Sequence, residues 1–232
     1  MTAFSYYSAG AQVTSTSSLM LTVPFPTSRA SGDVFFLVCR GATATACTFG
    51  SPSGVGAEQI GTKVAATSGT SINPVSSMQV FWWVHGGSNS SVSVTATTSG
   101  YFDIKAQIFG YRGSGEASIV GTPADATGGD STTFQGPSYS VGDSLITVIN
   151  VTVQAGVSGT LVVDEARDWT SRATLTNSPA ARLFDISGIP GTYASPTLSS
   201  GVSRAWLAKV WALSNPLGPV PADGWSVGQI KY

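Results

Sequence analysis

The sequence predicts an all-β protein, an antiparallel two-sheet sandwich that is jelly-roll-like and built from two internally repeated halves. Three observations support this fold class. Short runs rich in β-branched and aromatic residues recur along the 232 residues, separated by clusters of Gly, Pro, Ser and Asn. The chain holds 34 Ser, 26 Thr, 27 Gly and 12 Pro, so strand and turn formers outnumber helix formers. No apolar pattern of helical period extends beyond two turns, and the best helical candidate is one turn at 164–169.

The apolar patterns predict twelve strands in chain order. In 91–97, Val92 and Val94 alternate with polar residues, which predicts a strand with one wet face. The continuous apolar run at 34–38 predicts a strand that is covered on both faces or has one face in a subunit interface. The expected strands are 12–16, 19–23, 34–40, 58–65, 78–85, 91–97, 103–111, 144–153, 161–164, 181–186, 195–198 and 205–213.

Two stretches of the chain resemble each other. Gly-Asp-Val-Phe-Phe-Leu-Val at 32–38 parallels Gly-Asp-Ser-Leu-Ile-Thr-Val at 142–148. The segments that begin at Met78 and at Ala181 also match, as do the closing strands 104–111 and 204–211. We therefore expect each half to supply one set of strands, and the two sets to share a core when packed face to face.

These boundaries divide the chain into one β-sandwich domain at 1–213, with repeat-like halves at 24–111 and 137–213. The polar, Gly-rich stretch 113–136 between the halves is expected to be a surface crossover. The segment 214–232 contains three prolines and is expected to be a C-terminal extension that lies along the domain or reaches a neighbouring subunit.

Charge and hydropathy exclude several function classes. Only 10% of the residues are charged, against about 25% in an ordinary domain, and the net charge is −1. Such a chain lacks the basic surface that a phosphate-directed nucleic-acid binder needs. No apolar stretch is long enough for membrane insertion, and 1–10 has neither a basic nor an apolar signal region, so synthesis in a cytoplasm is expected. Because surface charge keeps monomers apart, the composition predicts a subunit of an assembly.

The chemistry-bearing residues form no catalytic constellation. His85 is the only histidine and is expected to have a structural role at a turn. Cys39 and Cys47 are expected to be buried free thiols, with a local disulfide as the alternative. Asp164, Glu165 and Asp168 are expected to form a solvated turn, with a calcium site or an acid–base pair as alternatives. We therefore expect no enzymatic activity, no catalytic residues, no cofactor and no metal site.

Aromatic residues are the remaining candidates for contacts with partners. In Phe81-Trp82-Trp83 adjacent rings must lie on opposite faces of one strand, so one face is core and the other meets solvent, a partner or a ligand. Such rings serve as interface anchors or as platforms on which sugars stack. The candidates for an interface or for glycan stacking are Trp82, Trp83, Trp169, Trp225, Tyr232, Phe4, Tyr6 and Tyr7.

A series of strand and turn motifs resembles a known family. The series comprises Gly-Asp-Val-Phe-Phe-Leu-Val ending at 38, Ser-Pro-Ser-Gly at 51–54, Val-Phe-Trp-Trp-Val at 80–84, and Ala-Trp-Leu-Ala-Lys-Val-Trp-Ala-Leu at 205–213. It is similar to the β-sandwich minor tail proteins, virion structural proteins of tailed bacteriophages of actinobacteria. The resemblance covers roughly 1–215, and Val55 stands where the family often has Trp. It implies a virion component and transfers no active site.

Three hypotheses follow. The first is a non-enzymatic virion structural protein, a minor tail subunit at the tail tip or along the tail, which acts as a homotrimer through contacts with other tail proteins. In a variant of it, the same fold is a capsid decoration protein that stabilises the shell. The second is a carbohydrate-binding module that recognises a host cell-surface glycan through exposed Trp residues. The third, a cell-wall hydrolase, lacks a supporting constellation.

Overall fold

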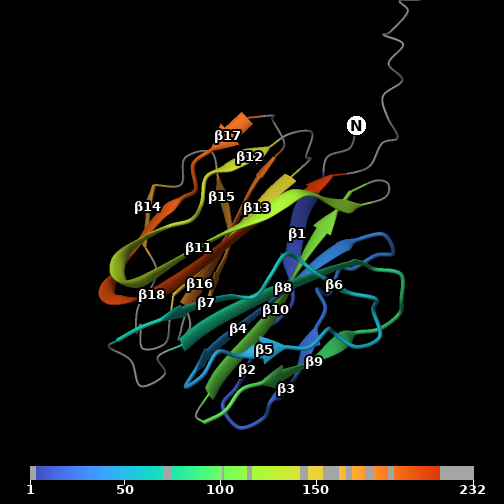
Figure 1. Ribbon diagram of the computed structural model, residues 1–232. Helices are drawn as coiled ribbons and strands as arrows, with labels where there is room; N and C mark the ends of the chain where they lie inside the picture. Colours follow the sequence, from blue (N-terminus) through green and yellow to red (C-terminus); the bar gives the residue numbers. More distant parts are fainter. Residues whose placement is uncertain are drawn as a thin grey trace, which may run out of the picture.

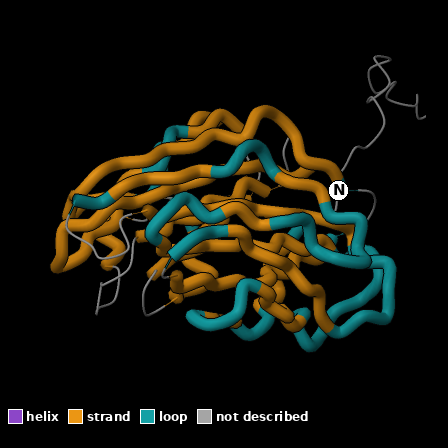
Figure 2. Tube along the Cα trace, turned by 60° about the horizontal axis from the view of Figure 1, so that its bottom comes forward, coloured by secondary structure: helices purple, strands orange, loops and turns teal. Residues whose placement is uncertain are grey.

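The computed structural model describes residues 4–69, 75–100, 102–113, 117–141, 146–153, 162–165, 169–175, 180–187 and 191–214. All regular secondary structure in these ranges is β-strand, and the paired strands run antiparallel (Figures 1 and 2). The all-β sandwich prediction is therefore confirmed. The jelly-roll connectivity and the origin of the halves as repeats stay predictions.

The first half of the chain builds two sheets, which occupy the lower part of Figure 1. The seven-stranded sheet has the order β1-β10-β4-β8-β6, with β2 on β10 and β7 on β8. Its strands are β1 (Ser5–Ala9), β2 (Val13–Ser15), β4 (Val34–Thr43), β6 (Glu58–Gln59), β7 (Val64–Thr67), β8 (Val75–Val84) and β10 (Phe102–Arg112). The three-stranded sheet comprises β3 (Met20–Pro24), β5 (Thr48–Phe49) and β9 (Ser91–Thr97).

The second half builds the upper part of Figure 1. Its six-stranded sheet has the order β11-β18-β13-β16-β15, with β14 on β18. The strands are β11 (Ser118–Gln135), β13 (Ile146–Val153), β14 (Val162–Glu165), β15 (Thr170–Leu175), β16 (Ala180–Ser187) and β18 (Thr197–Ser214). A two-stranded sheet pairs β12 (Tyr139–Val141) with β17 (Gly191–Tyr193).

Three apolar clusters hold these layers together. The central cluster joins the two large sheets and includes Phe36 from β4 and Trp211 from β18. A second cluster lies between the seven-stranded and three-stranded sheets, and a third joins the six-stranded sheet to Tyr139 and Trp169. Every residue of β4 is buried, as the continuous apolar run predicted. The small outer sheets are an addition to the expected two layers.

The two large sheets share one order of pairing. In the first, β1, β10, β4 and β8 lie side by side, and in the second β11, β18, β13 and β16 do. The strands that match in sequence, β4 with β13, β8 with β16 and β10 with β18, thus hold equivalent places. In the outer layers, β3 pairs with β9 just as β12 pairs with β17.

Several local predictions were wrong. The single strand expected at 58–65 is divided into β6 and β7. The expected crossover 113–136 is mostly strand β11, because it pairs with β18 along its length and, as an edge strand, accommodates Pro123 at an irregularity in the register. The strands expected at 195–198 and 205–213 are not separate, because one strand, β18, runs from 197 to 214. The helical turn expected at 164–169 is also wrong at its start, because Asp164 and Glu165 lie in strand β14. Apart from Ser214, the predicted C-terminal extension lies outside the described residues.

Arg40 and Lys105 place two cations inside the sandwich. They are cross-strand neighbours on β4 and β10, and their side chains are 0% and 2% exposed. Arg40 donates one hydrogen bond, from Nη2 to Gln12 Oε1 at 3.3 Å, while its Nε and Nη1 have no partner. Burial lowers the pKa of both groups, and Asp103 is the acid that opposes this shift. A buried guanidinium with so few partners destabilises the folded state.

We expect Arg40→Met to raise the free energy of unfolding by about 1–3 kcal/mol, because an apolar side chain of similar length removes the desolvation penalty. Urea denaturation measures the change. As the matched control, Arg112→Met removes an arginine that is paired with Asp33 and should lower stability. Destabilisation by Arg40→Met would show that the buried guanidinium is fully paired in solution.

A glycine pair on β11 offers a second test. An added Cβ at Gly128 would lie 2.1 Å from Nε1 of Trp206, the residue across the strand pair, whereas a Cβ at Gly129 meets no atom within 4 Å. We expect Gly128→Ala to lower stability by about 1–2 kcal/mol through overpacking. Gly129→Ala should change it little. Thermal unfolding of both variants checks this, and equal effects would contradict the contact.

Candidate functional site

A surface cavity of about 300 Å³ lies where β8 ends. One wall is the turn at Gly54 and Val55. The other walls are Trp83 and Val84 at the end of β8, together with the stretch 85–87 and Asn89 that follows it. Because loops on a rigid sheet commonly carry binding residues, this cavity is the candidate functional site.

The backbone of the β8 end is fixed by the segment that precedes β4. His85 N donates to Asp33 O at 2.7 Å, and Gly32 N donates to His85 O at 2.8 Å. Gly32 has a φ of +87°, a conformation that glycine adopts without strain. These two backbone hydrogen bonds fix the position of His85, the residue with which the chain leaves β8 and enters the cavity wall.

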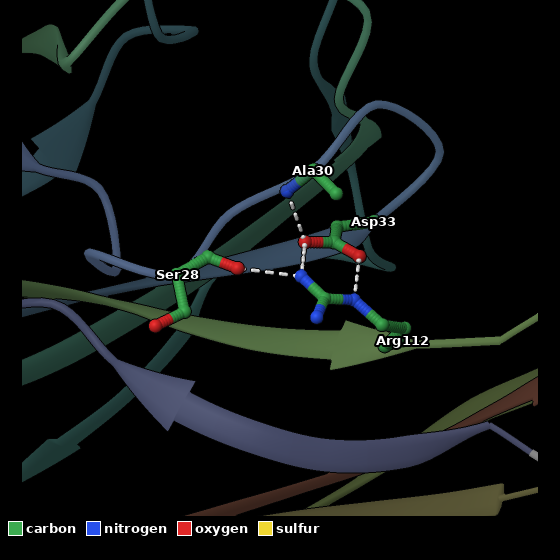
Figure 3. Close-up of polar contacts among 4 residues, drawn as sticks. All are labelled: Ser28, Ala30, Asp33 and Arg112. Carbon is green, nitrogen blue, oxygen red and sulfur yellow. Dashed lines mark hydrogen bonds and ion pairs between the residues drawn. The ribbon is translucent and has the colours of Figure 1, made fainter.

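The Asp33 carboxylate anchors that segment in turn (Figure 3). Arg112, the last residue of β10, donates from Nε and Nη2 to the two carboxylate oxygens, each at 2.8 Å. Ala30 N donates to the same carboxylate at 2.7 Å, and Arg112 also donates to Ser28 O at 2.5 Å. Burial raises the pKa of Asp33, but these hydrogen bonds outweigh burial and hold the pKa below its ordinary value. The ion pair thus joins the ends of two strands far apart in sequence.

His85 contributes a neutral ring to the cavity wall. Its imidazole is 4% exposed and lies 5.4 Å from the Phe25 ring and 5.2 Å from the Phe35 ring, measured between centroids. Burial lowers the pKa of His85, and the positive charge of Arg29 lowers it further. The imidazole is therefore uncharged at pH 7 and both donates and accepts hydrogen bonds.

Trp83 contributes a fixed indole ring to the cavity lining. Its ring is 3% exposed and packs against Phe25 and Phe35, with centroids 6.0 Å and 5.7 Å away. The indole Nε1 is buried and has no hydrogen-bond partner. Val84, the next residue, is 43% exposed. None of the described residues that line the cavity carries a charged side chain, so its chemistry suits an uncharged ligand.

The structure separates the aromatic residues that the sequence proposed as contacts. Phe4, Trp83 and Trp169 are buried within the chain, so they are not exposed surfaces on which a partner or a sugar could stack. The correction has a simple cause, since each of these rings completes one of the three apolar clusters. Trp225 and Tyr232 lie outside the described residues.

Trp82, Tyr6 and Tyr7 are half-buried. Trp82 packs against the central cluster, so of the two adjacent tryptophans Trp83 faces the outer cluster and Trp82 the central one. The Tyr7 ring lies over Gly110 and against the Arg112 guanidinium, 4.5 Å from the ring centroid. These residues do not gather at one site. Sequence reasoning did not place His85 and Asn89 in a cavity, because neither belongs to a catalytic or ligand-binding motif.

The cysteines and the acidic cluster proposed from the sequence form neither a disulfide nor a described metal site. Cys39 and Cys47 are buried free thiols, as predicted, and the disulfide alternative is wrong. Asp164 and Glu165 belong to the backbone of β14, and Asp168 lies outside the described residues. In the part of the chain that the structure covers, no three His, Cys, Asp or Glu side chains are grouped as a metal site would require. In the same part, no helix has the length and apolar character to cross a bilayer.

Comparisons with protein family models, curated proteins and solved structures found no match to this chain.

The Asp33–Arg112 pair predicts a dependence of stability on pH. Because the pKa of Asp33 is lower in the folded state, its stabilising effect is complete above its ordinary pKa of 3.8 and is lost as the pH falls through the folded-state pKa. We expect Asp33→Asn to lower the melting temperature at pH 6, and the difference from the unmodified protein to shrink below about pH 4. Thermal melts across this range measure it. Glu58→Gln, at an exposed carboxylate, is the control; a difference for Asp33→Asn that is constant with pH would contradict the prediction.

Proposed function

We propose that this chain is a non-enzymatic structural subunit of a bacteriophage virion, a minor tail protein that acts through contacts with copies of itself and with other tail proteins. The observation that carries the proposal is the long edge strand β11. It runs for 18 residues, and among the described strands it pairs only with β18, so no described strand pairs with its other edge. Such an edge is a template for pairing with another chain.

The charged side chains of β11 do not protect this edge against pairing with another chain. Proteins commonly protect edge strands with charged side chains. The charged residues of β11 are Asp125 and Asp130, and both are engaged within the chain. Asp125 accepts a hydrogen bond from Lys209 Nζ at 2.6 Å, and Asp130 accepts from Ser68 Oγ and from Gly69 N. The strand is therefore suited to strand addition by a neighbouring subunit.

Exposed large apolar side chains are few in the part of the chain that the structure describes. Among the described residues, the large hydrophobic side chains that are exposed are Met20 and Val84. The apolar inner faces of the two large sheets already cover each other. Backbone pairing at β11, supported by Ser and Thr side chains, is therefore the mode of assembly that we favour. The low charge and the resemblance to minor tail proteins support the same function.

We expect the purified protein to be a homotrimer, with a mass in light scattering three times the 23.7 kDa of one chain. The double variant Thr122→Lys/Thr127→Lys places two charges at exposed positions of β11 and should shift the protein to monomers. Thr16→Lys/Ser17→Lys adds the same charge at exposed positions just after β2 and should leave the trimer intact. A monomeric unmodified protein would contradict the proposal.

Location is tested separately, by labelling intact particles with gold-conjugated antibodies. We expect label on the tail. Label distributed over the head would instead support the capsid decoration function, and particles without label would contradict both.

A further inference from the structure

We propose that His85 is an acid-sensitive switch: when its imidazole gains a proton, the turn that follows β8 separates from the segment that precedes β4. This proposal goes beyond the assembly role and does not depend on it, because His85 and β11 belong to different parts of the fold. His85 is the only histidine of the chain, so no other imidazole titrates in the same pH range.

The His85 ring lies in an apolar environment. It is buried and contacts the rings of Phe25, which follows β3, and of Phe35, which belongs to β4. The neutral imidazole packs against these two rings, whereas the charged form would lose most of its hydration there. Protonation in place is therefore unfavourable, and a protonated ring is stabilised by moving into water.

The charges around His85 also oppose protonation. The Arg29 guanidinium lies over the same Phe25 ring that His85 contacts, 5.9 Å from its centroid. Asp33 is the acid that favours the charged imidazole, but Arg112 already binds both of its carboxylate oxygens (Figure 3). Burial and then the charge of Arg29 thus keep the pKa of His85 below its ordinary value of 6.5.

The backbone of His85 makes the contact that the switch breaks. His85 N donates to Asp33 O at 2.7 Å and Gly32 N donates to His85 O at 2.8 Å, which extends the pairing of β4 with β8 by one step. Further along, Phe25 N donates to Ser90 O at 2.9 Å. We call the arrangement with these bonds the closed state. Movement of a charged His85 ring toward water breaks the two bonds at His85 and releases the cavity wall.

The pH range of the switch follows from the pKa of His85. Because this pKa is lower in the closed state than in the open one, the closed state is most stable above about pH 6.5. It loses stability as the pH falls from 6.5 toward the closed-state pKa, and the loss is complete below that pKa. The carboxylate of Asp33 stays ionised in this range, because its own pKa lies below 3.8. Opening at His85 is therefore separate from the loss of the Asp33–Arg112 pair.

The test measures protonation and opening on the full chain by NMR. The ring Cε1–H resonance of the single histidine reports its pKa, which we expect below 6.5. Amide hydrogen exchange, corrected for the intrinsic rate at each pH, gives the opening constants at Gly32, His85 and Phe25. Between about pH 7.5 and about pH 5 these constants should rise toward a limiting factor, ten raised to the difference between 6.5 and the measured pKa. The amide of Leu37, inside β4, should not change.

Two variants connect the opening with His85 and its neighbours. His85→Gln has a neutral polar side chain that does not take up a proton, so the opening constants should no longer depend on pH. Arg29→Gln removes a cation that disfavours protonation, so the pKa of His85 should rise toward 6.5 and the effect of acid should shrink. Lys63→Gln is the matched control, since it removes a cation bound to Thr48, and both quantities should stay as they are.

The proposal is refuted by a measured pKa of His85 at or above 6.5. It is also refuted if the opening constants at Gly32 and His85 stay constant while His85 becomes protonated, or if their rise in acid persists in His85→Gln. Should His85→Gln not fold, Arg29→Gln decides: a raised pKa of His85 with an undiminished effect of acid on opening would show that His85 is not the switch.

Discussion

The packing of the two large sheets against each other is the contact on which the rest of the structure depends. Trp211 from β18 is fully buried and its ring centroid lies 5.4 Å from that of Phe36 on β4, so each half fills the apolar face of the other. Neither face could remain in water without the cost of exposing a wide hydrophobic surface. This mutual coverage fixes the inner faces of both sheets and leaves only edges, outer faces and loops for other roles.

Coverage of the outer faces explains where the candidate site forms. Since β4 is buried on both sides, the three-stranded sheet must lie across its outer face, and the chain crosses between the layers beyond the ends of β3, β4 and β8. The crossing near Asp33 is held by Arg112, and the crossing after β8 is held by His85 through the Asp33 backbone. The cavity at Trp83 is thus a product of layer packing, and long-range contacts give it its shape.

This dependence shows what the sequence could and could not predict. The apolar run at 34–38 predicted a strand covered on both faces, because such a pattern has no polar side to turn to water. The sequence did not predict strand β11, because the local propensities of its Gly and Pro residues favour a loop. Pairing with β18 stabilises these residues in a strand instead. The adjacent positions of Trp82 and Trp83 predicted that their rings lie on opposite faces of the strand. The cavity could not be predicted in this way, because its walls are held in place by contacts between residues as distant in sequence as Asp33 and Arg112.

Many of the few charged side chains are buried or bonded within the chain, and this lowers the charge that remains on the surface. Within the described ranges, the charged side chains that are buried or bonded to other parts of the chain include Asp33, Arg40, Lys105, Arg112, Asp125, Asp130, Arg172, Asp185 and Lys209. The surface charge that opposes association is therefore even smaller than the 10% composition suggests. The two aspartates of the edge strand β11 are engaged within the chain, so little electrostatic repulsion or desolvation of ions would oppose the pairing proposed for this edge.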